Sequence, residues 1–486
     1  MKPFRYLPRL RLVPRRVRPR RIPTQSYLAV SPPNLAANRV PKVRLFSSTS
    51  FSTSNWGPSY GPIEDVEGLY GYQPGGHHPL NINDLVHDRY RVVHKLGHGS
   101  FSTIWLALDE SSADARYVAI KVCTAEYDGG EVNILRQLRR SPGIGESFWV
   151  PKILHHFGID GPNGRHECIV TPPARCSLRD AREASSRWLF PLDVARSMAA
   201  QLAMAVQVVH EWGWVHGDIH FGNILLQMPA SLNHLTVQQL YEQFGAPDPQ
   251  PVLLLKETGE ETRQSDSESP PLPTGVPSYA IPPIWLGKSG DDLSLSETKI
   301  ILTDFGVAFR PEDKSRFESY TPLVSRPPEA LFEPTVPLSF ASDIWSLGCV
   351  IFEIMGHRSL IDGILATQNR VTTQHVHLLG KPPAEWWAKW QSREKHFDDD
   401  GTPRDKESDI WNWERRFEGW VQSPRRDFGM EVMGQEEAHA FMDMLKTMVV
   451  WRPEERPTAE DFMDMEWMKK WAIPAYEEGI KRMCKS

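Results

Sequence analysis

One stretch decides the fold of this chain: His216-Gly217-Asp218-Ile219-His220-Phe221-Gly222-Asn223, followed directly by the apolar run Ile224-Leu225-Leu226. Asp218 precedes Asn223 by five residues, so a single loop can carry both side chains. An aspartate in such a loop can accept the proton of an attacking hydroxyl, while the asparagine can hold a metal ion on a nucleotide phosphate. The loop therefore predicts a site of phosphoryl transfer.

Two further fragments fit the same chemistry. Downstream, Thr303-Asp304-Phe305-Gly306 supplies a second acid, Asp304, suited to a Mg²⁺ that bridges phosphates. Upstream, the stretch 118–121 (Val-Ala-Ile-Lys) reads as a strand that ends in Lys121. In this order and at these spacings, the fragments resemble the protein kinase family, which implies that Lys121 holds the α- and β-phosphates of ATP.

The resemblance extends to a glycine-rich loop. A predicted strand over 90–96 leads into Gly97-His98-Gly99, and Ser102 stands where the family has its third glycine. Bare backbone at such glycines can approach the phosphates closely. A second strand at 166–170 runs into Thr171-Pro172-Pro173-Ala174, which resembles the hinge between the two lobes. By this resemblance the nucleotide-binding residues are Leu96, Gly97, His98, Gly99, Ser100, Phe101, Ser102, Ile104, Ala119, Lys121 and Ala174.

The family also implies a carboxylate partner for Lys121 on the next helix. Glu131 fits by its distance from the lysine and by the apolar face that follows it. Glu126 competes for this role, but Gly129-Gly130 separates it from the helical pattern. Catalytic roles are therefore expected for Asp218, Lys121, Glu131 and His220, and metal binding for Asn223 and Asp304.

Three signals outside the chemistry also match the family. Arg326-Pro327-Pro328-Glu329 resembles the end of an activation segment, and Glu329 is expected to pair with Arg456. Asp343, in a pattern that starts an apolar helix, is expected to hold the backbone of the catalytic loop. The run 192–212 has apolar residues at helical spacing and predicts a core helix of the larger lobe.

Eighty residues separate Asn223 from Asp304, where the minimal family pattern needs only a hairpin. The part at 235–244 has helical character, whereas 257–277 is acidic and rich in Ser and Pro, which predicts disorder. An insert at this point resembles the spacer of the SR-protein kinases. The stretch from Leu96 to Leu106 is similar to the glycine-rich loop of that family. The Leu-Leu-Gly-Lys-Pro-Pro run at 378–383 resembles one found in the larger group that contains this family together with the cyclin-dependent and mitogen-activated kinases.

Two departures from the family pattern affect the mechanism. Gly217 stands where an arginine often receives an activation-loop phosphate, so a segment active without phosphorylation of Ser315, Ser319 or Thr321 is expected. His220 replaces a lysine that neutralises charge on the transferring phosphoryl group, so a lowered turnover is expected.

Two rival functions remain open from the sequence. The His-Gly-Asp-x-His-x-Gly-Asn loop also resembles that of small-molecule phosphotransferases of the aminoglycoside and choline kinase type. A nucleotide-binding pseudokinase would rest on Ser102, Gly217 and His220, although all four main catalytic positions are filled. The expected activity is transfer of the γ-phosphoryl group of ATP, with Mg²⁺, to Ser or Thr of protein substrates, and the SR-protein kinase resemblance implies Arg/Ser-rich or basic ones.

Composition limits the remaining possibilities. The first 63 residues contain 12 Lys or Arg and no Asp or Glu, which leaves 43 basic against 61 acidic residues in the rest, a balance of −18. The net negative charge of this part of the chain, the acidic body, attracts basic partners over long range and so favours their association. No apolar run is long enough for a membrane helix, no direct nucleic-acid binding is expected, and nothing demands an oligomer.

The N-terminal composition is typical of an organellar transit peptide, and Arg44-Leu45-Phe46-Ser47-Ser48 resembles a mitochondrial processing site. Prolines interrupt any amphipathic helix there, so a basic disordered tail on a cytoplasmic or nuclear protein is the alternative.

These expectations together give an α+β, bilobal protein kinase fold, with a β-rich N-lobe and a helical C-lobe. The predicted organisation is a basic tail at 1–55, a linker at 56–88, a kinase domain at 89–476 and a C-terminal tail at 477–486. Within the domain, the N-lobe is expected at about 89–172, the C-lobe at about 173–476, and the spacer insert at 228–297.

Overall fold

The computed structural model describes residues 60–111, 116–127, 129–139, 149–255, 271–405 and 410–485. The basic tail expected at 1–55 lies outside these residues, as do positions 257–270 of the acidic stretch within the insert. Among the described residues, no helix is both long and apolar enough to cross a membrane.

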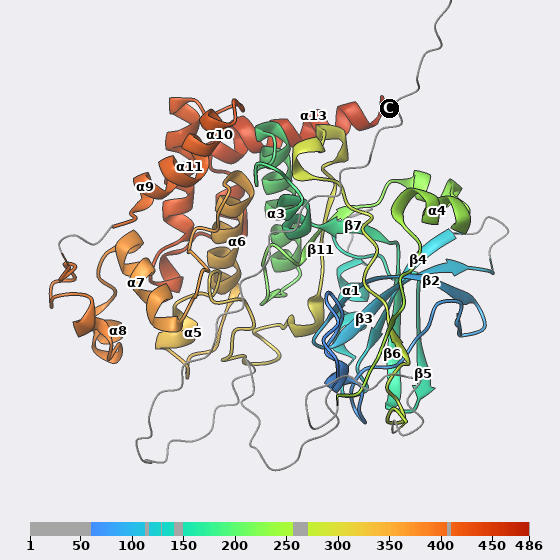
Figure 1. Cartoon of the computed structure of the whole chain (residues 1–486). Helices are drawn as coiled ribbons and strands as arrows, with labels where there is room; N and C mark the ends of the chain where they lie inside the picture. The colour runs from blue at the N-terminus through green and yellow to red at the C-terminus, as the bar shows by residue number, and fades with distance from the viewer. Residues whose placement is uncertain are drawn as a thin grey trace, which may run out of the picture. The chain divides into compact units, whose positions relative to one another are not determined.

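The N-lobe is built on a six-stranded antiparallel sheet with the order β1-β2-β3-β4-β6-β5 (Figure 1). Its helix α1 (Gly130–Arg139) covers the sheet through Val132, which packs against Cys123 and Ile169. The strands are β1 (Leu85–Val86), β2 (Tyr90–Gly99), β3 (Ser102–Asp109), β4 (Arg116–Cys123), β5 (His155–Gly161) and β6 (Gly164–Thr171).

The C-lobe is organised around two buried helices, α3 (Leu192–Glu211) and α6 (Phe340–Met355). Helix α6 is buried on all sides from Ser342 to Met355, as expected of a helix enclosed by others. The other C-lobe helices are α2 (Leu178–Glu183), α5 (Glu329–Phe332), α7 (Gln368–Leu379), α8 (Ala384–Lys389), α9 (Trp413–Phe417), α10 (Ser423–Asp427), α11 (Gln435–Met448), α12 (Ala459–Met463) and α13 (Ile473–Met483). The predicted α+β bilobal fold is thereby confirmed.

A small sheet at the start of the C-lobe positions the chemistry. Its strands β7 (Ala174–Ser177), β8 (Ile224–Gln227) and β11 (Ile300–Leu302) lie in the order β11-β8-β7. Ile224 pairs with Leu302, and the Thr303 N–H donates to the Asn223 carbonyl at 2.8 Å. This pairing brings Asn223, which precedes β8, beside Asp304, which follows β11, although the two are far apart in sequence.

The segment 60–88, expected as a linker, packs against the N-lobe sheet. The Glu67 carboxylate forms a buried ion pair with Lys95 of β2, and Glu67 also accepts the hydroxyl of Tyr72. β1 extends the sheet by pairing with β2. Sequence periodicity could not show this, because the contacts join isolated residues of an irregular segment to a strand.

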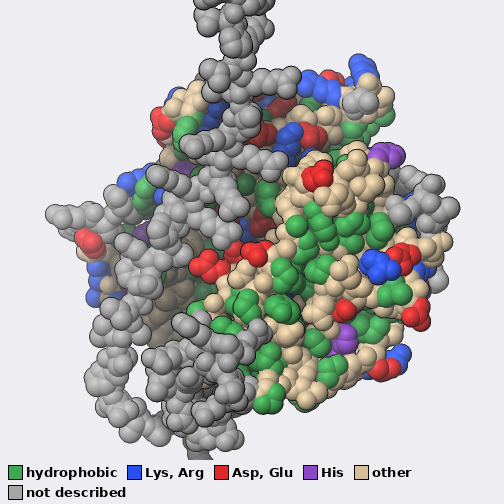
Figure 2. Space-filling view, turned by 45° about the vertical axis from the view of Figure 1, so that its right-hand side comes forward, with side chains coloured by type: hydrophobic (Ala, Val, Ile, Leu, Met, Phe, Trp, Pro, Cys, Tyr) green, Lys and Arg blue, Asp and Glu red, His purple; other side chains and the backbone are tan. Residues whose placement is uncertain are grey.

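The described parts of the insert also pack on the N-lobe. Helix α4 (Val237–Phe244) lies where helical character was predicted, and Leu240 joins a core cluster with Val93 and Leu106 of the sheet. The Tyr241 hydroxyl donates to the Val93 carbonyl at 2.7 Å, and the short strands β9 (Gln250–Pro251) and β10 (Tyr279–Ala280) pair with each other. The N-lobe side faces the viewer in Figure 2, where hydrophobic side chains cover much of the described surface.

At the C-terminal end of the chain, a tail was expected from residue 477 onward. Residues 477–483 instead form the second half of helix α13 (Ile473–Met483). A Cβ added to Gly479 would lie only 2.9 Å from the Leu295 carbonyl oxygen, so the helix approaches the end of the insert closely. The domain boundary expected at residue 476 therefore falls inside a packed helix.

Candidate active site

The catalytic loop is held in place by Asp343 at the start of α6. Its two carboxylate oxygens accept the backbone N–H groups of His216, at 2.7 Å, and Gly217, at 2.9 Å. His210 of α3 contacts the same carboxylate at 3.0 Å. The role predicted for Asp343, support of the loop backbone, is the one that the structure shows.

Gly217 has a backbone conformation that explains its identity. Its φ is +79°, in the left-handed region where side chains other than glycine are strained. The arginine that the family carries at this position would have to adopt that strained backbone here. Glycine adopts this backbone conformation without strain.

Asp218 and Asn223 face each other across the loop, as their spacing implied. The Asn223 amide donates to the Asp218 carbonyl at 3.0 Å and to its Oδ2 at 3.3 Å. The second carboxylate oxygen of Asp218, Oδ1, is buried and has no hydrogen-bond partner in the described part of the chain. A buried acceptor left without a donor is costly, so a substrate hydroxyl would find an acceptor ready at this atom.

The surroundings raise the pKa of Asp218 to about 7. Burial of the carboxylate is the largest cause, and the nearby negative charge of Asp304 adds to it. A general base works best when its pKa lies near the working pH. A cation bound between Asp304 and Asn223 would offset the repulsion and favour the ionised form.

His220 is neutral and has a defined tautomer. Its Nδ1 accepts the Gly222 N–H at 3.0 Å, so the proton lies on Nε2, which is 3.7 Å from the Asp218 Oδ2. Burial, followed by the charge of Arg179, lowers the pKa of His220 to about 4. The side chain can thus donate one hydrogen bond beside the catalytic carboxylate, but it brings no positive charge at neutral pH.

Lys121, Glu131 and Asp304 form one network between the lobes. The Lys121 Nζ lies 2.7 Å from the Glu131 Oε2 and 3.0 Å from the Asp304 Oδ1. The backbone N–H of Phe305 donates to the other oxygen of Glu131 at 3.3 Å. Glu126, the competing candidate, lies instead beside Gly75, whose added Cβ would be 2.5 Å from its carboxylate.

The same network sets the charge of Asp304. Lys121 is the main cause of the lowered pKa of this carboxyl, which keeps it ionised. Asp304 also has a left-handed backbone, with φ of +66°, which is uncommon for a residue other than glycine. Such strain concentrates at functional positions, where the surrounding contacts maintain it.

The glycine-rich loop is the turn between β2 and β3. Gly97 pairs with Ile104 and Gly99 with Ser102 across the hairpin, and a Cβ added to either glycine would meet no atom within 4 Å. Protein packing therefore does not require these glycines, whereas close approach of the backbone to a ligand would. Phe101 at the tip is 63% exposed.

Ser102 is the first residue of β3, and its backbone is not in the left-handed region, so a third glycine is not needed there. On the opposite wall, Ala119 is buried and pairs with Thr171 of the expected hinge. Ala174 opens β7, directly after the two prolines.

The activation segment docks on the catalytic loop through hydrogen bonds of its own residues. The buried Thr321 donates its hydroxyl to the Gly217 carbonyl at 3.3 Å, and Arg326 donates to the Thr321 carbonyl at 2.9 Å. Glu329 and Arg456 form the predicted buried pair, with two bonds of 2.7 Å.

Two residues that contribute to the site were not predicted from the sequence. The Tyr127 hydroxyl lies 3.3 Å from the Glu131 Oε2, and the charge of Asp218 acts on the half-buried Arg326 guanidinium. Tyr127 sits in an irregular stretch with no pattern to mark it. Arg326 was visible as the first residue of a motif, but only the fold places it near the catalytic carboxylate.

The donor set fits a nucleotide with Mg²⁺. Hard oxygen ligands from Asn223 and Asp304 suit Mg²⁺, which prefers one or two protein ligands plus substrate phosphates. Lys121 offers its positive charge at the same place, and the glycine backbone above it is open.

Comparison with known proteins bears on the same chemistry. The model "Protein tyrosine and serine/threonine kinase" matches residues 90–236, and the model "Protein kinase domain" matches residues 292–468. The stretch between the two matches, 237–291, lies within the expected insert.

Some curated relatives align with most of the chain and others with only a part of it. "Serine/threonine-protein kinase SRPK" of Physarum polycephalum is 27% identical over 429 residues, which are 83% of this chain and 91% of that protein. A serine/threonine protein kinase of Aspergillus fumigatus is 24% identical over 421 residues, 83% of this chain and 90% of its own. Human "SRSF protein kinase 3" is 32% identical over 195 residues, 38% of this chain and 34% of that protein.

Proposed function

The chain is an SR-protein-kinase-like member of the eukaryotic protein kinases, a serine/threonine kinase, and from this premise we propose that it transfers the γ-phosphoryl group of ATP–Mg²⁺ to serines of Arg-rich protein segments. The observation that carries the proposal is the joined network of Lys121, Glu131 and Asp304 beside Asp218 and Asn223. Both the Lys–Glu ion pair and the metal-binding aspartate must be in place for phosphoryl transfer in this family.

The residues divide the work as follows. Lys121 neutralises charge on the α- and β-phosphates, and Glu131 fixes its position. Asp218 Oδ1 orients the substrate hydroxyl and receives its proton as the new bond from serine oxygen to the γ-phosphorus forms and the bond to the ADP oxygen breaks. Mg²⁺ held by Asn223 and Asp304 would neutralise the phosphate oxygens.

The rival functions are not favoured. A small-molecule phosphotransferase would not need the activation segment that ends in the buried Glu329–Arg456 pair, and the relatives are named as protein kinases. A pseudokinase is disfavoured because the catalytic and metal-binding positions are filled and lie together.

The choice of Arg/Ser-rich substrates rests on two supports. One is the printed name of the relatives, SRPK and SRSF protein kinase. The other is the acidic character of the body of the chain, with a balance of −18 beyond residue 63. A negative field attracts basic segments and raises their rate of encounter.

The test measures transfer of the labelled phosphoryl group from [γ-³²P]ATP–Mg²⁺ to three acceptor peptides, which carry Arg/Ser, Lys/Ser or Gln/Ser repeats. We expect the highest kcat/KM for the Arg/Ser peptide, and no transfer by the Asp218→Asn and Lys121→Met forms. Equal kcat/KM for the Arg/Ser and Gln/Ser peptides would refute Arg selection. Transfer that survives both substitutions would refute the assignment of the site.

We further propose that residues 1–55 direct the chain to mitochondria; these residues lie outside the described part of the structure. The support is the basic, acid-free composition and the Arg-Leu-Phe-Ser-Ser run at 44–48. A fluorescent protein fused behind residues 1–63 should enter mitochondria and be cleaved near residue 46. Uniform cytoplasmic or nuclear fluorescence of the uncleaved fusion would contradict targeting.

A further inference from the structure

The catalytic loop, residues 216–223, contains no Lys or Arg. His220 stands at the position of the family's lysine, and its imidazole is neutral. Lys121 serves the α- and β-phosphates and is bound to Glu131 and Asp304, so it does not take the place of the missing lysine. The oxygens of the γ-phosphoryl group carry negative charge during transfer, and a positioned cation stabilises that charge. Such a cation would have to come from another element of the fold.

Helix α2 packs on the catalytic loop through both of its arginines. Arg182 stacks over the Phe221 ring at 4.5 Å, and its guanidinium forms a buried ion pair of 2.7 Å with Glu353. Arg179, one turn earlier on the helix, reaches the next residue of the loop. Its Cζ lies 3.4 Å from the position that a Cβ on Gly222 would take. The loop therefore meets one arginine that is paired and a second one beside it.

The contact at Gly222 also brings Arg179 beside His220. A Cβ on Gly222 would lie 3.0 Å from the His220 Cε1, so the guanidinium and the imidazole meet where this residue has no side chain. The Nε2 of His220, which is bonded to Cε1, lies 3.7 Å from the Asp218 Oδ2. After burial, the charge of Arg179 is the largest cause of the lowered pKa of His220. Arg179 thus brings a positive charge to the imidazole that lies beside the catalytic carboxylate.

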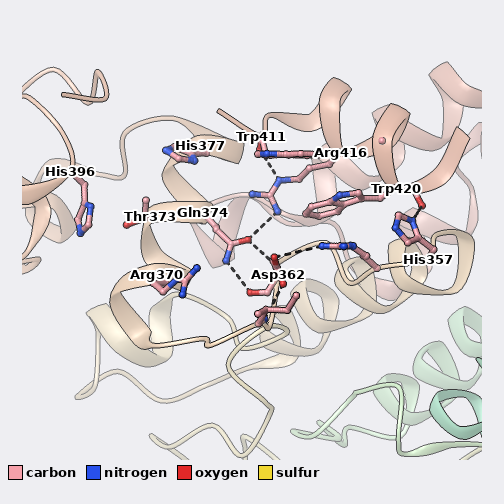
Figure 3. Close-up of a pocket in the computed structure, with 13 residues that line it drawn as sticks. His357, Asp362, Arg370, Thr373, Gln374, His377, His396, Trp411, Arg416 and Trp420 are labelled. Atoms are coloured by element: carbon pink, nitrogen blue, oxygen red, sulfur yellow. Dashed lines mark hydrogen bonds and ion pairs between the residues drawn. The ribbon is translucent and has the colours of Figure 1, made fainter. Parts of the chain in front are cut away.

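Arg179 is not held in the way that a structural arginine of this chain is held. Arg416, in the C-lobe pocket of Figure 3, donates to the carbonyls of Trp411 and Leu360 and to the side chain of Gln374, and only 1% of it is exposed. Arg179 is exposed, and it makes no hydrogen bond or ion pair with any residue that the structure describes. Its guanidinium can therefore turn toward a ligand without breaking a contact of the described fold.

Arg326 is a second cation near the catalytic carboxylate, and its contacts suit it less. Its Nε donates to the Thr321 carbonyl at 2.9 Å, which holds the side chain in the activation segment. Burial lowers the pKa of Arg326, and the charge of Asp218 opposes that effect, so its charge already acts on the carboxylate. Arg179 has no such engagement within the described part of the chain and remains available to an incoming phosphoryl group.

We propose that Arg179 is a catalytic residue that supplies, from α2, the positive charge that the loop lacks at His220. An N–H of its guanidinium donates to an oxygen of the γ-phosphoryl group. Meanwhile the serine oxygen bonds to the phosphorus, the bond to the ADP oxygen breaks, and the serine proton passes to Asp218. Arg179 keeps its own proton throughout. The inference rests on the proposed phosphoryl transfer and adds one residue to it.

The test is a double-mutant cycle on kcat, measured with ATP–Mg²⁺ and the Arg/Ser-repeat peptide. It compares the parent chain with the Arg179→Met, His220→Lys and doubly substituted forms. We expect Arg179→Met to lower the kcat of the parent by about tenfold, with KM values for ATP and peptide within about twofold. In the His220→Lys background, where the lysine supplies the charge, the same change should lower kcat by less than about threefold.

Two control variants separate charge from structure. Arg179→Lys keeps the positive charge and should retain at least about a third of the parent kcat. Arg187→Met removes the same charge from an exposed site beyond the end of α2 and should leave kcat unchanged. The melting temperature of Arg179→Met should equal that of the parent, because no described contact is lost.

An equal loss of kcat in the parent and His220→Lys backgrounds would overturn the proposal, because Arg179 would then act independently of the missing lysine. An unchanged kcat in Arg179→Met, or a rise only in the KM for the peptide, would overturn it as well. A parent chain that hydrolyses ATP without phosphorylating the peptide would count against Arg/Ser substrates alone, and the cycle is then measured on hydrolysis. A parent chain with neither activity would refute the proposed function and this inference together.

Discussion

At the scale of single residues, burial acts in opposite directions on two neighbours in the catalytic loop. It raises the pKa of the Asp218 carboxyl and lowers the pKa of the His220 imidazole, because in each case the charged form loses hydration. A base and a neutral hydrogen-bond donor therefore lie side by side.

A prediction about stability follows from Asp218. Its pKa is 3.8 when exposed and about 7 in the fold, so the folded chain binds the proton more tightly and loses stability as the pH rises from about 4 to about 7. At about 1.36 kcal/mol for each pKa unit, the loss is on the order of 4 kcal/mol. The Asp218→Asn form, without nucleotide or Mg²⁺, should therefore unfold at a higher temperature than the parent at pH 8. The difference should vanish near pH 4, and a lower melting temperature at pH 8 would contradict this origin of the pKa.

His220 supplies a prediction about rate. Because it is uncharged, the His220→Lys form should gain a fixed cation beside the reacting phosphoryl group and raise kcat by about tenfold, equivalent to about 1.4 kcal/mol of the barrier. His220→Gln, a neutral donor of hydrogen bonds, serves as the control and should stay within about threefold of the parent. A decrease of kcat on introducing lysine would show that histidine has a role beyond donating one hydrogen bond.

The candidate catalytic residues could be predicted from the sequence because each belongs to a motif in a fixed order along the chain. The sequence could not determine the protonation of His220, which depends on the Gly222 N–H, on burial and on Arg179. Nor could it show the orphaned Oδ1 of Asp218, since burial of a single atom is a property of the folded structure.

At the scale of elements, the activation segment is held by its own hydrogen bonds. Ser319 donates to Thr321, whose hydroxyl reaches the Gly217 carbonyl. Thr321 is only 3% exposed, so another kinase would not reach its hydroxyl without displacing the segment.

We therefore predict activity without phosphorylation of this segment. Phosphatase-treated chain, and the Ser315→Ala and Ser319→Ala forms, should retain at least half of the parent kcat/KM. Thr321→Ser keeps the hydroxyl and serves as the control for the contact with Gly217. Loss of most activity on phosphatase treatment would contradict the prediction.

The segment before β1 provides a second prediction at this scale. Lys95 is fully buried and pairs with Glu67, so removal of one partner leaves an uncompensated charge in the N-lobe, at a cost of about 3–5 kcal/mol. The Glu67→Leu form should therefore have a much lower free energy of unfolding. The double form Glu67→Leu, Lys95→Met should recover most of the loss, measured by urea unfolding. A double variant no more stable than the single one would show that packing, rather than charge, is responsible.

The helices, strands and irregular segments differ in how well the sequence predicts them. Helix α3 and the strands around Lys121 follow from regular apolar spacing, and α4 from a short helical pattern. Segment 60–88 has no such period, and its contact with the sheet depends on Glu67 meeting a lysine of β2. Irregular segments held by a few specific pairs leave little trace in sequence periodicity.

At the scale of the whole molecule, the two lobes are joined by side chains as well as by the hinge. Lys121 of the N-lobe sheet reaches Asp304 of the C-lobe, and Glu131 of α1 accepts the Phe305 N–H. The described parts of the insert, attached to the C-lobe at both ends, pack on the N-lobe sheet through Leu240 and Tyr241. These contacts hold the candidate catalytic residues of the two lobes together.

This arrangement should form a working serine/threonine kinase in spite of Gly217 and His220. The most direct measurement is transfer from [γ-³²P]ATP–Mg²⁺ to an Arg/Ser-repeat peptide in a single turnover, followed by phosphoamino-acid analysis. We predict phosphoserine formation by the parent chain and none by the Asp218→Asn form. Tight binding of ATP–Mg²⁺ by the parent without formation of any phosphoserine would contradict the claim.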